Sequence, residues 1–250
     1  MSTKKTRKIA GILLVVILAS VVFVVFRNER RRANIQFARS IAAINPRGGT
    51  PRTIEGLRRA IALYEAQIQR HVREGAQTGV YWKILGIRLA DGGMHRDALA
   101  AFERAIHFNA EDATIFYLSG ISAAIVANSI IGFSPNAQSE REHFFQLSEN
   151  AHRRALQLDA QFLRPMYALG VLYAFNLERP QEAIPLLETY LRAMPNDIEA
   201  MFVLARAHFM TGGFEAALEL YDRIISRTRD ENARREARNN MQIVWSHMYG

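Results

Sequence analysis

The chain has 250 residues, 49% of them hydrophobic, which is enough to bury one sizeable folded domain with some length left over. Its formal net charge of +8 is unevenly spread: residues 1–52 hold 11 Lys and Arg against one acid, whereas residues 53–250 hold 21 basic and 23 acidic residues. The folded part is thus close to neutral, which argues against nucleic-acid binding, because phosphate recognition needs a basic surface. Cysteine is absent, and this excludes disulfides, thiolate metal sites and a cysteine nucleophile.

An uncharged apolar run of 18 residues, 9–26, follows a short basic tail over residues 1–8. At about 1.5 Å per residue the run reaches roughly 27 Å as a helix, just enough for a bilayer core. A cleaved signal peptide is the alternative interpretation. However, the run is longer than a usual signal core, and no small-x-small cleavage site follows it. We therefore expect residues 9–26 to form an uncleaved transmembrane helix.

Residues 27–52 form a basic juxtamembrane stalk and linker, which ends in the helix-breaking sequence Asn-Pro-Arg-Gly-Gly-Thr-Pro over 45–51. Within it, apolar residues keep a helical spacing at Ile35, Ala38, Ile41 and Ala42. This segment is either a stalk that lifts the domain off the bilayer or a collar that touches anionic headgroups. Basic residues flank the span equally on both sides, so the positive-inside rule does not decide the orientation. We expect the N-terminus inside and the domain outside the cytoplasm.

From residue 53 onward the apolar periodicity is helical, and no segment alternates as a half-buried strand does, so the expected fold class is all-α. The first amphipathic helix, over 53–78, is expected to cap the helices that come after it in the chain. Its apolar face holds Leu57, Ile61, Tyr64 and Ile68.

Residues 79–112 carry the spacing of two closely crossing helices: Trp82-x2-Leu85-Gly86-x2-Leu89, then Ala98-x3-Phe102-x2-Ala105. This pattern resembles the tetratricopeptide repeat, a pair of antiparallel helices with a period of about 34 residues. The resemblance implies a helical-hairpin solenoid of four repeats over 79–112, 113–162, 163–197 and 198–231, closed by a C-terminal capping helix over 232–250. Such arrays bind other proteins or peptide segments.

The second repeat departs from this pattern, because about 16 extra residues separate its two halves. We expect two lengthened helices, over 113–131 and 137–158, that form a hairpin projecting beyond its neighbours. The apolar residues near its tip are either a partner contact or packed on an adjacent helix. They are Ile130, Ile131 and Phe133. In the closing helix, Trp245 is expected to be a core residue that caps the solenoid.

In this family the first helix of each repeat lines a concave groove. The resemblance therefore implies a mostly apolar and aromatic partner-binding groove built from Lys83, Ile87, Tyr117, Ile121, Tyr167, Val171, Phe202, Arg206 and Phe209. Chaperone-binding members hold a terminal carboxylate with paired Lys, Asn and Arg. Here Ile87, Leu118 and Ile121 occupy comparable places, which disfavours a chaperone adaptor.

No catalytic or metal-binding pattern stands out, because the seven histidines include no pair at metal-ligand spacing and no glycine-rich phosphate loop occurs. We expect no enzyme activity, no cofactor and no metal. The leading hypothesis is a single-pass protein of a bacterial inner membrane with a periplasmic repeat domain. It would act as a protein-interaction scaffold for an envelope complex of the biogenesis, secretion or flagellar-collar type. An organelle import receptor with a cytosolic repeat domain and an accessory subunit of a solute transporter are the alternatives.

Overall fold

The structure is a computed structural model, and it describes residues 35–39, 42–43, 53–132 and 134–249. The chain divides into two compact units, of which the first ends at Glu74 and the second begins at Gly75. The described residues are in helices or in the turns between them, and none of them forms a strand. The expected all-α fold is therefore confirmed.

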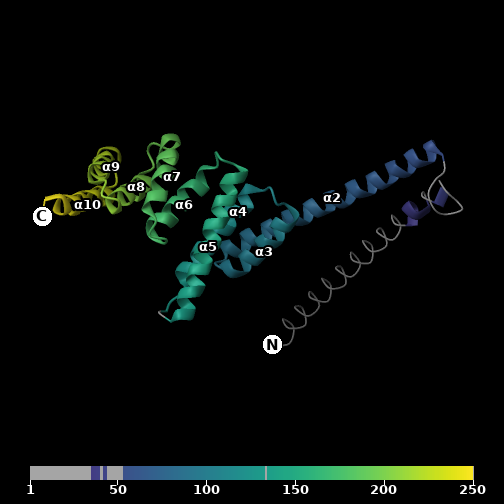
Figure 1. Ribbon diagram of the computed structural model, residues 1–250, viewed down its shortest axis with the longest axis horizontal. Coiled ribbons are helices and arrows are strands. Elements are labelled where there is room, and N and C mark those ends of the chain that lie inside the picture. The colour runs from purple at the N-terminus through teal and green to yellow at the C-terminus, as the bar shows by residue number, and fades with distance from the viewer. Residues whose placement is uncertain (1–34, 40–41, 44–52, 133, 250) are drawn as a thin grey trace, which may run out of the picture. The chain divides into compact units, whose positions relative to one another are not determined.

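Nine long helices account for most of the described residues (Figure 1). In chain order they are α2 (Ile54–Asp91), α3 (His95–Phe108), α4 (Ala113–Ser129), α5 (Pro135–Leu158), α6 (Leu163–Phe175), α7 (Pro180–Ala193), α8 (Ile198–Met210), α9 (Phe214–Arg227) and α10 (Glu231–Tyr249).

The transmembrane span expected over residues 9–26 lies outside the described residues, as does the helix break over 45–51. Within the part of the chain that the structure describes, no helix combines the length and the apolar character needed to cross a bilayer.

In the first unit, residues 35–39 and 42–43 are helical, and the Phe37 ring meets the Tyr64 ring edge-on, with 5.3 Å between the ring centres. The structure differs here from the two separate elements expected on either side of residue 78. Instead, α2 runs unbroken from Ile54 to Asp91. The sequence between the expected elements offers Gly75 and Gly79 but no proline, and single glycines weaken a helix without ending it.

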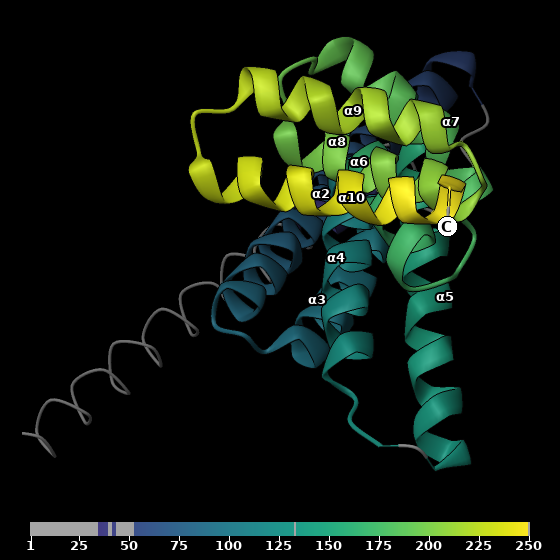
Figure 2. The same cartoon turned by 90° about the vertical axis from the view of Figure 1, so that its left-hand side faces the viewer.

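In the second unit, helices that follow one another along the chain pack together from α3 to α10. The first helices of successive pairs also touch, since α4 contacts α6 and α6 contacts α8. This continuous row of first helices gives a solenoid with a face lined by α4, α6 and α8. The last helix, α10, packs against α9 (Figure 2).

In the first three repeats, the two helices cross where a glycine of the first helix meets a large side chain of the second. A Cβ atom added to Gly86 would lie 2.5 Å from the Phe102 ring, and one added to Gly170 would lie 2.7 Å from Leu187. Gly120 has the same relation to His152, at 2.6 Å. Because Phe102 and Leu187 are fully buried, neither can move aside easily. The close crossing expected at Gly86 is thus present and recurs in the next two repeats.

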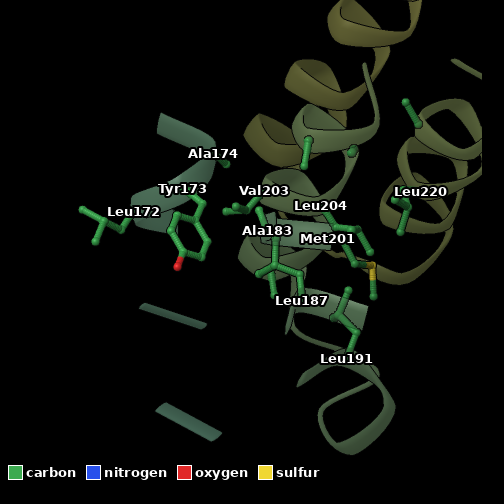
Figure 3. Close-up of a cluster of buried hydrophobic side chains, with 14 of the residues drawn as sticks. Leu172, Tyr173, Ala174, Ala183, Leu187, Leu191, Met201, Val203, Leu204 and Leu220 are labelled. Atoms are coloured by element: carbon green, nitrogen blue, oxygen red, sulfur yellow. The ribbon is translucent and has the colours of Figure 1, made fainter. Parts of the chain in front are cut away.

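Most residues that the repeat pattern places in the seams are buried, and the largest continuous core spans the third and fourth repeats. Figure 3 shows part of it, where Leu172 and Tyr173 of α6 lie near Ala183, Leu187 and Leu191 of α7 and Met201, Val203 and Leu204 of α8. Leu85 is an exception, because its side chain is 44% exposed. It lies on the first repeat, where no described helix of the second unit precedes it to cover that face.

The C-terminal helix packs against the last repeat through part of its apolar face. Ala237 and Val244 are buried, and Met241 packs against the same core. Trp245 is 46% exposed, so its assignment to the capping core is wrong. Consecutive residues on a helix point about 100° apart, and with Val244 in the seam the neighbouring Trp245 must turn outward.

The lengthened hairpin of the second repeat is present, with α5 reaching past the neighbouring helices (Figure 2). Its turn differs by two residues from the expected one. Helix α4 ends at Ser129, and α5 begins at Pro135, which stands at the first helical position after the N-cap Ser134. The Ser134 hydroxyl accepts a hydrogen bond from the Ala137 N–H.

Candidate functional site

A hollow of about 370 Å³ opens where α4, α5, α6 and α7 face one another. Four of the predicted groove residues line it, two from each of the first helices of the second and third repeats: Tyr117, Ile121, Tyr167 and Val171. The Tyr167 ring stacks at a tilt on Tyr190 of α7, with 5.3 Å between ring centres. We call this hollow the upper groove. Its wall is aromatic and branched aliphatic, a surface suited to apolar side chains of a bound segment.

Apart from the Arg164 guanidinium, the polar groups that line the upper groove are neutral donors and acceptors. Burial, together with a hydrogen bond from the Tyr190 hydroxyl to Asp197, raises the Tyr190 pKa to about 12. Burial also raises the pKa of Tyr167. On the far side, the Asn176 side chain donates a hydrogen bond to the Asn128 side chain at 3.1 Å. Hydroxyls and amides of this kind can meet the N–H and C=O groups of an extended peptide.

A second hollow of about 300 Å³ lies between α8, α9 and α10, and we call it the lower groove. It brings together the other three predicted residues of the fourth repeat, Phe202, Arg206 and Phe209. The Arg206 guanidinium lies over the Phe175 ring, 4.6 Å from its centre. This arrangement holds a cation against an aromatic face while leaving it open to solvent.

Residues of α10 also line the lower groove, and the sequence pattern did not single them out: Glu236, Asn240 and Ile243. The closing helix α10 therefore occupies the position that the first helix of a fifth repeat would take. The helical period places these three on one face, but the repeat pattern indicates only a capping role for α10.

The first two predicted groove residues, Lys83 and Ile87, line neither hollow. The Lys83 ammonium donates to the Asp112 carboxylate at 2.7 Å, and this ion pair ties α2 to the N-terminus of α4. Ile87 packs against the buried cluster around Phe102. Their contacts in this structure hold the first repeat to the second.

Beneath the upper groove, His152 is 1% exposed, and its Nδ1 has no hydrogen-bond partner. The nearby Ser148 hydroxyl is likewise buried and unpartnered. His152 stands where the other repeats have Phe102, Leu187 and Tyr221 against the first helix. Burial lowers its pKa to about 4, because the interior disfavours the charged imidazolium. A neutral histidine in an apolar environment therefore lies at the floor of the upper groove. Sequence reasoning missed it, because the insertion obscured the register of the second repeat.

The competing surface is the tip of the α4–α5 hairpin. Ile131 is 95% exposed there, whereas Ile130 is partly covered and its carbonyl accepts a hydrogen bond from Arg141 at 2.7 Å. Phe133 lies outside the described residues. A third hollow of about 590 Å³ lies along this hairpin, between Ile130, Arg141 and Phe175, and it has a larger polar share of wall than the upper groove. One fully exposed isoleucine therefore marks the tip.

Over the described ranges, no three His, Asp or Glu side chains are placed to hold a metal ion. The most connected charged cluster joins Glu149 and Glu182 with Arg153 and Arg179, and Tyr173 is hydrogen-bonded to it. This cluster ties α5 to α6 and to the start of α7.

Comparison with known proteins gives the fold a name. Residues 174–238 match a tetratricopeptide repeat family model. A solved structure described as YrrB, a TPR protein with an unusual peptide-binding site, is similar at a TM-score of 0.58 and 17% identity, over 72% of this chain and 82% of that one. MamA from Desulfovibrio magneticus RS-1 is similar at a TM-score of 0.53 and 16% sequence identity, over 68% of this chain and 92% of that one. MamA AMB-1 is similar at a TM-score of 0.54 and 19% sequence identity, over 68% of this chain and 82% of that one.

No curated protein matches the chain. At these identities the structural likeness shows the fold alone, which is similar to that of tetratricopeptide repeat solenoids, and the family model matches residues 174–238 within it. Repeat solenoids of this type present surfaces for binding other proteins or peptides.

Proposed function

We propose that this chain is a membrane-anchored scaffold that recruits protein partners of an envelope complex by holding a peptide segment of each partner in its groove. The observation that carries the proposal is the convergence of Tyr117, Ile121, Tyr167 and Val171 on one hollow with neutral polar groups at its edge. A similar structure is described as having a peptide-binding site, and this supports the same use of the solenoid face here.

The bound segment is expected to be extended and mainly apolar at the upper groove. Hydroxyl and amide groups can pair with its backbone, while aromatic rings cover its side chains. The lower groove adds Arg206 and Glu236, which can select a polar residue further along the segment.

Partner recovery tests this proposal. Replacing Tyr167 and Phe202 together by alanine should remove most partner binding, because truncating a buried aromatic anchor commonly costs about 2 kcal/mol or more. Both residues also pack on the core, as Val171 does, so Ile121→Lys provides a second variant: Ile121 lines the upper groove and is not among the residues packed on that core. Recovery of crosslinked partners from native membranes, with circular dichroism of each variant, is the measurement.

Two controls make the result specific. Tyr249→Ala removes a tyrosine that is 81% exposed and lines neither groove, and it should leave recovery unchanged. Ile131→Ser alters the hairpin tip. Loss of partners from the Ile131 variant alone would mean that the protein recruits through the hairpin and that the groove assignment is wrong.

The anchoring part of the proposal rests on the apolar run over residues 9–26. A reporter that is active only outside the cytoplasm, fused after Gly250, should be active if the repeat domain is periplasmic. Deleting residues 9–26 from the same fusion should abolish the activity, which is the matched control. Activity of a cytoplasm-only reporter at this site would instead favour the import-receptor alternative.

A further inference from the structure

The first part of α2 presents a row of large apolar side chains to solvent. The exposed fractions are 72% for Ile54, 38% for Leu57, 55% for Ile61, 50% for Tyr64 and 58% for Ile68. We call these five residues the α2 seam. Single exposed apolar residues are ordinary, but a continuous row over about 21 Å of helix is not.

The seam has the spacing of a coiled coil. Its members follow one another at intervals of three, four, three and four residues, which is the 3.5-residue period of positions a and d in a heptad. Isoleucine fills all three a positions (Ile54, Ile61 and Ile68), and the first d position is Leu57. Isoleucine at a with leucine at d favours two parallel strands over higher oligomers. The row ends where His71 and Gly75 take the next d and a positions.

The chain offers the seam little cover of its own. Among the described residues, the ring of Phe37 reaches Tyr64, but Ile61 and Ile68 on either side of it stay more than half exposed. Residues 27–34, which lie outside the described ranges, read Arg-Asn-Glu-Arg-Arg-Arg-Ala-Asn and contain no large apolar side chain. The residues that the structure describes thus leave most of the seam open to a second molecule.

We propose that two copies of this chain pair through the α2 seam as a short parallel coiled coil. In that pairing the flanking g and e positions bring Thr53 beside Arg58, Ala60 beside Glu65 and Gln67 beside Val72, so no like charges oppose each other. A seam of 15 residues, little more than two heptads, gives a weak dimer in free solution. Two copies held in one membrane meet at a much higher effective concentration and with the same orientation.

The absence of cysteine allows a direct test with the full-length chain. Single variants Ile54→Cys and Ile68→Cys place one thiol at each end of the seam. In a parallel pair each thiol lies beside the same residue of the second chain. Mild oxidation of native membranes should therefore convert a large share of both variants to a disulfide-linked dimer, with twice the 28.4 kDa mass of the chain. The matched control is Ala66→Cys, an exposed position on the opposite side of the same helix, which should stay monomeric.

A second variant separates pairing at the seam from chance encounters. In the Ile54→Cys background, Ile61→Glu with Ile68→Glu should lower the disulfide yield by about tenfold, because charges in the seam would be buried on pairing. Equal disulfide yields from Ile54→Cys and Ala66→Cys would overturn the proposal. It would also be overturned if the two glutamates left the disulfide yield of Ile54→Cys unchanged. Failure of both seam variants to crosslink would exclude the parallel pair. None of these outcomes bears on partner binding in the groove.

Discussion

Replacing Gly86 by alanine should destabilise the protein by about 1–3 kcal/mol, although alanine is the better helix former by about 1 kcal/mol. The added Cβ would stand 2.5 Å from the Phe102 ring, and Phe102 is fully buried, so the helices of the first repeat must separate. Leucine at the same position should cost more. Thermal unfolding followed by circular dichroism measures the loss.

The matched control is Gly75→Ala in the same helix. Its Cβ would meet nothing closer than the Phe108 side chain at 3.9 Å, an ordinary contact. This variant should be neutral or slightly more stable, because it gains helix propensity without a clash. If the Gly86 variant melted as the Gly75 variant does, the register of the first repeat would be misplaced.

Stability should fall steeply between pH 6.5 and pH 4 because of His152. Its pKa in the folded state is about 4, against 6.5 for an ordinary histidine, so the unfolded chain takes up a proton over this range and the folded chain does not. Each pH unit then removes about 1.4 kcal/mol, up to roughly 3 kcal/mol in all, and no His152 contribution remains above pH 6.5. Denaturant titrations at several pH values give this slope.

His152→Phe should flatten the slope, since the first repeat already seats Phe102 against a glycine in the equivalent place. His143→Gln, which changes an exposed histidine of the same helix, should leave the slope as it is. Carboxylates with lowered pKa values, such as Asp112 and Glu182, also lose their stabilising charge in acid. The difference between the two variants therefore isolates His152. An unchanged slope in the His152 variant would mean that the buried imidazole is protonated in the fold.

Repeat spacing predicted the helix pairs well. Two helices can cross this closely only where a small residue on one meets a large residue on the other, as Gly86 meets Phe102 and Gly170 meets Leu187. The hairpin of the second repeat was also predicted, since a Gly-Phe-Ser-Pro turn can interrupt a helix in few other ways. Local patterns of this kind need no knowledge of the distant chain.

Features that depend on neighbouring elements were harder to predict. The continuity of α2 turns on whether Gly75 and Gly79 break a helix, and propensity alone does not decide this. Trp245 and Val244 compete for the same seam, and only the packing of α10 against α9 selects Val244. The sequence did not single out His152. Its equivalence to the large seam residues of the other repeats can be recognised only after the insertion of the second repeat has been aligned.

The groove can be tested most directly by asking what touches it. A photoreactive amino acid placed at Val171 in the upper groove, in the full-length chain and in native membranes, should crosslink to one or a few partner proteins through a short continuous segment. The same probe at Tyr249 should capture none of them. Capture of those partners from Ile131 but not from Val171 would contradict the account and move recruitment to the hairpin.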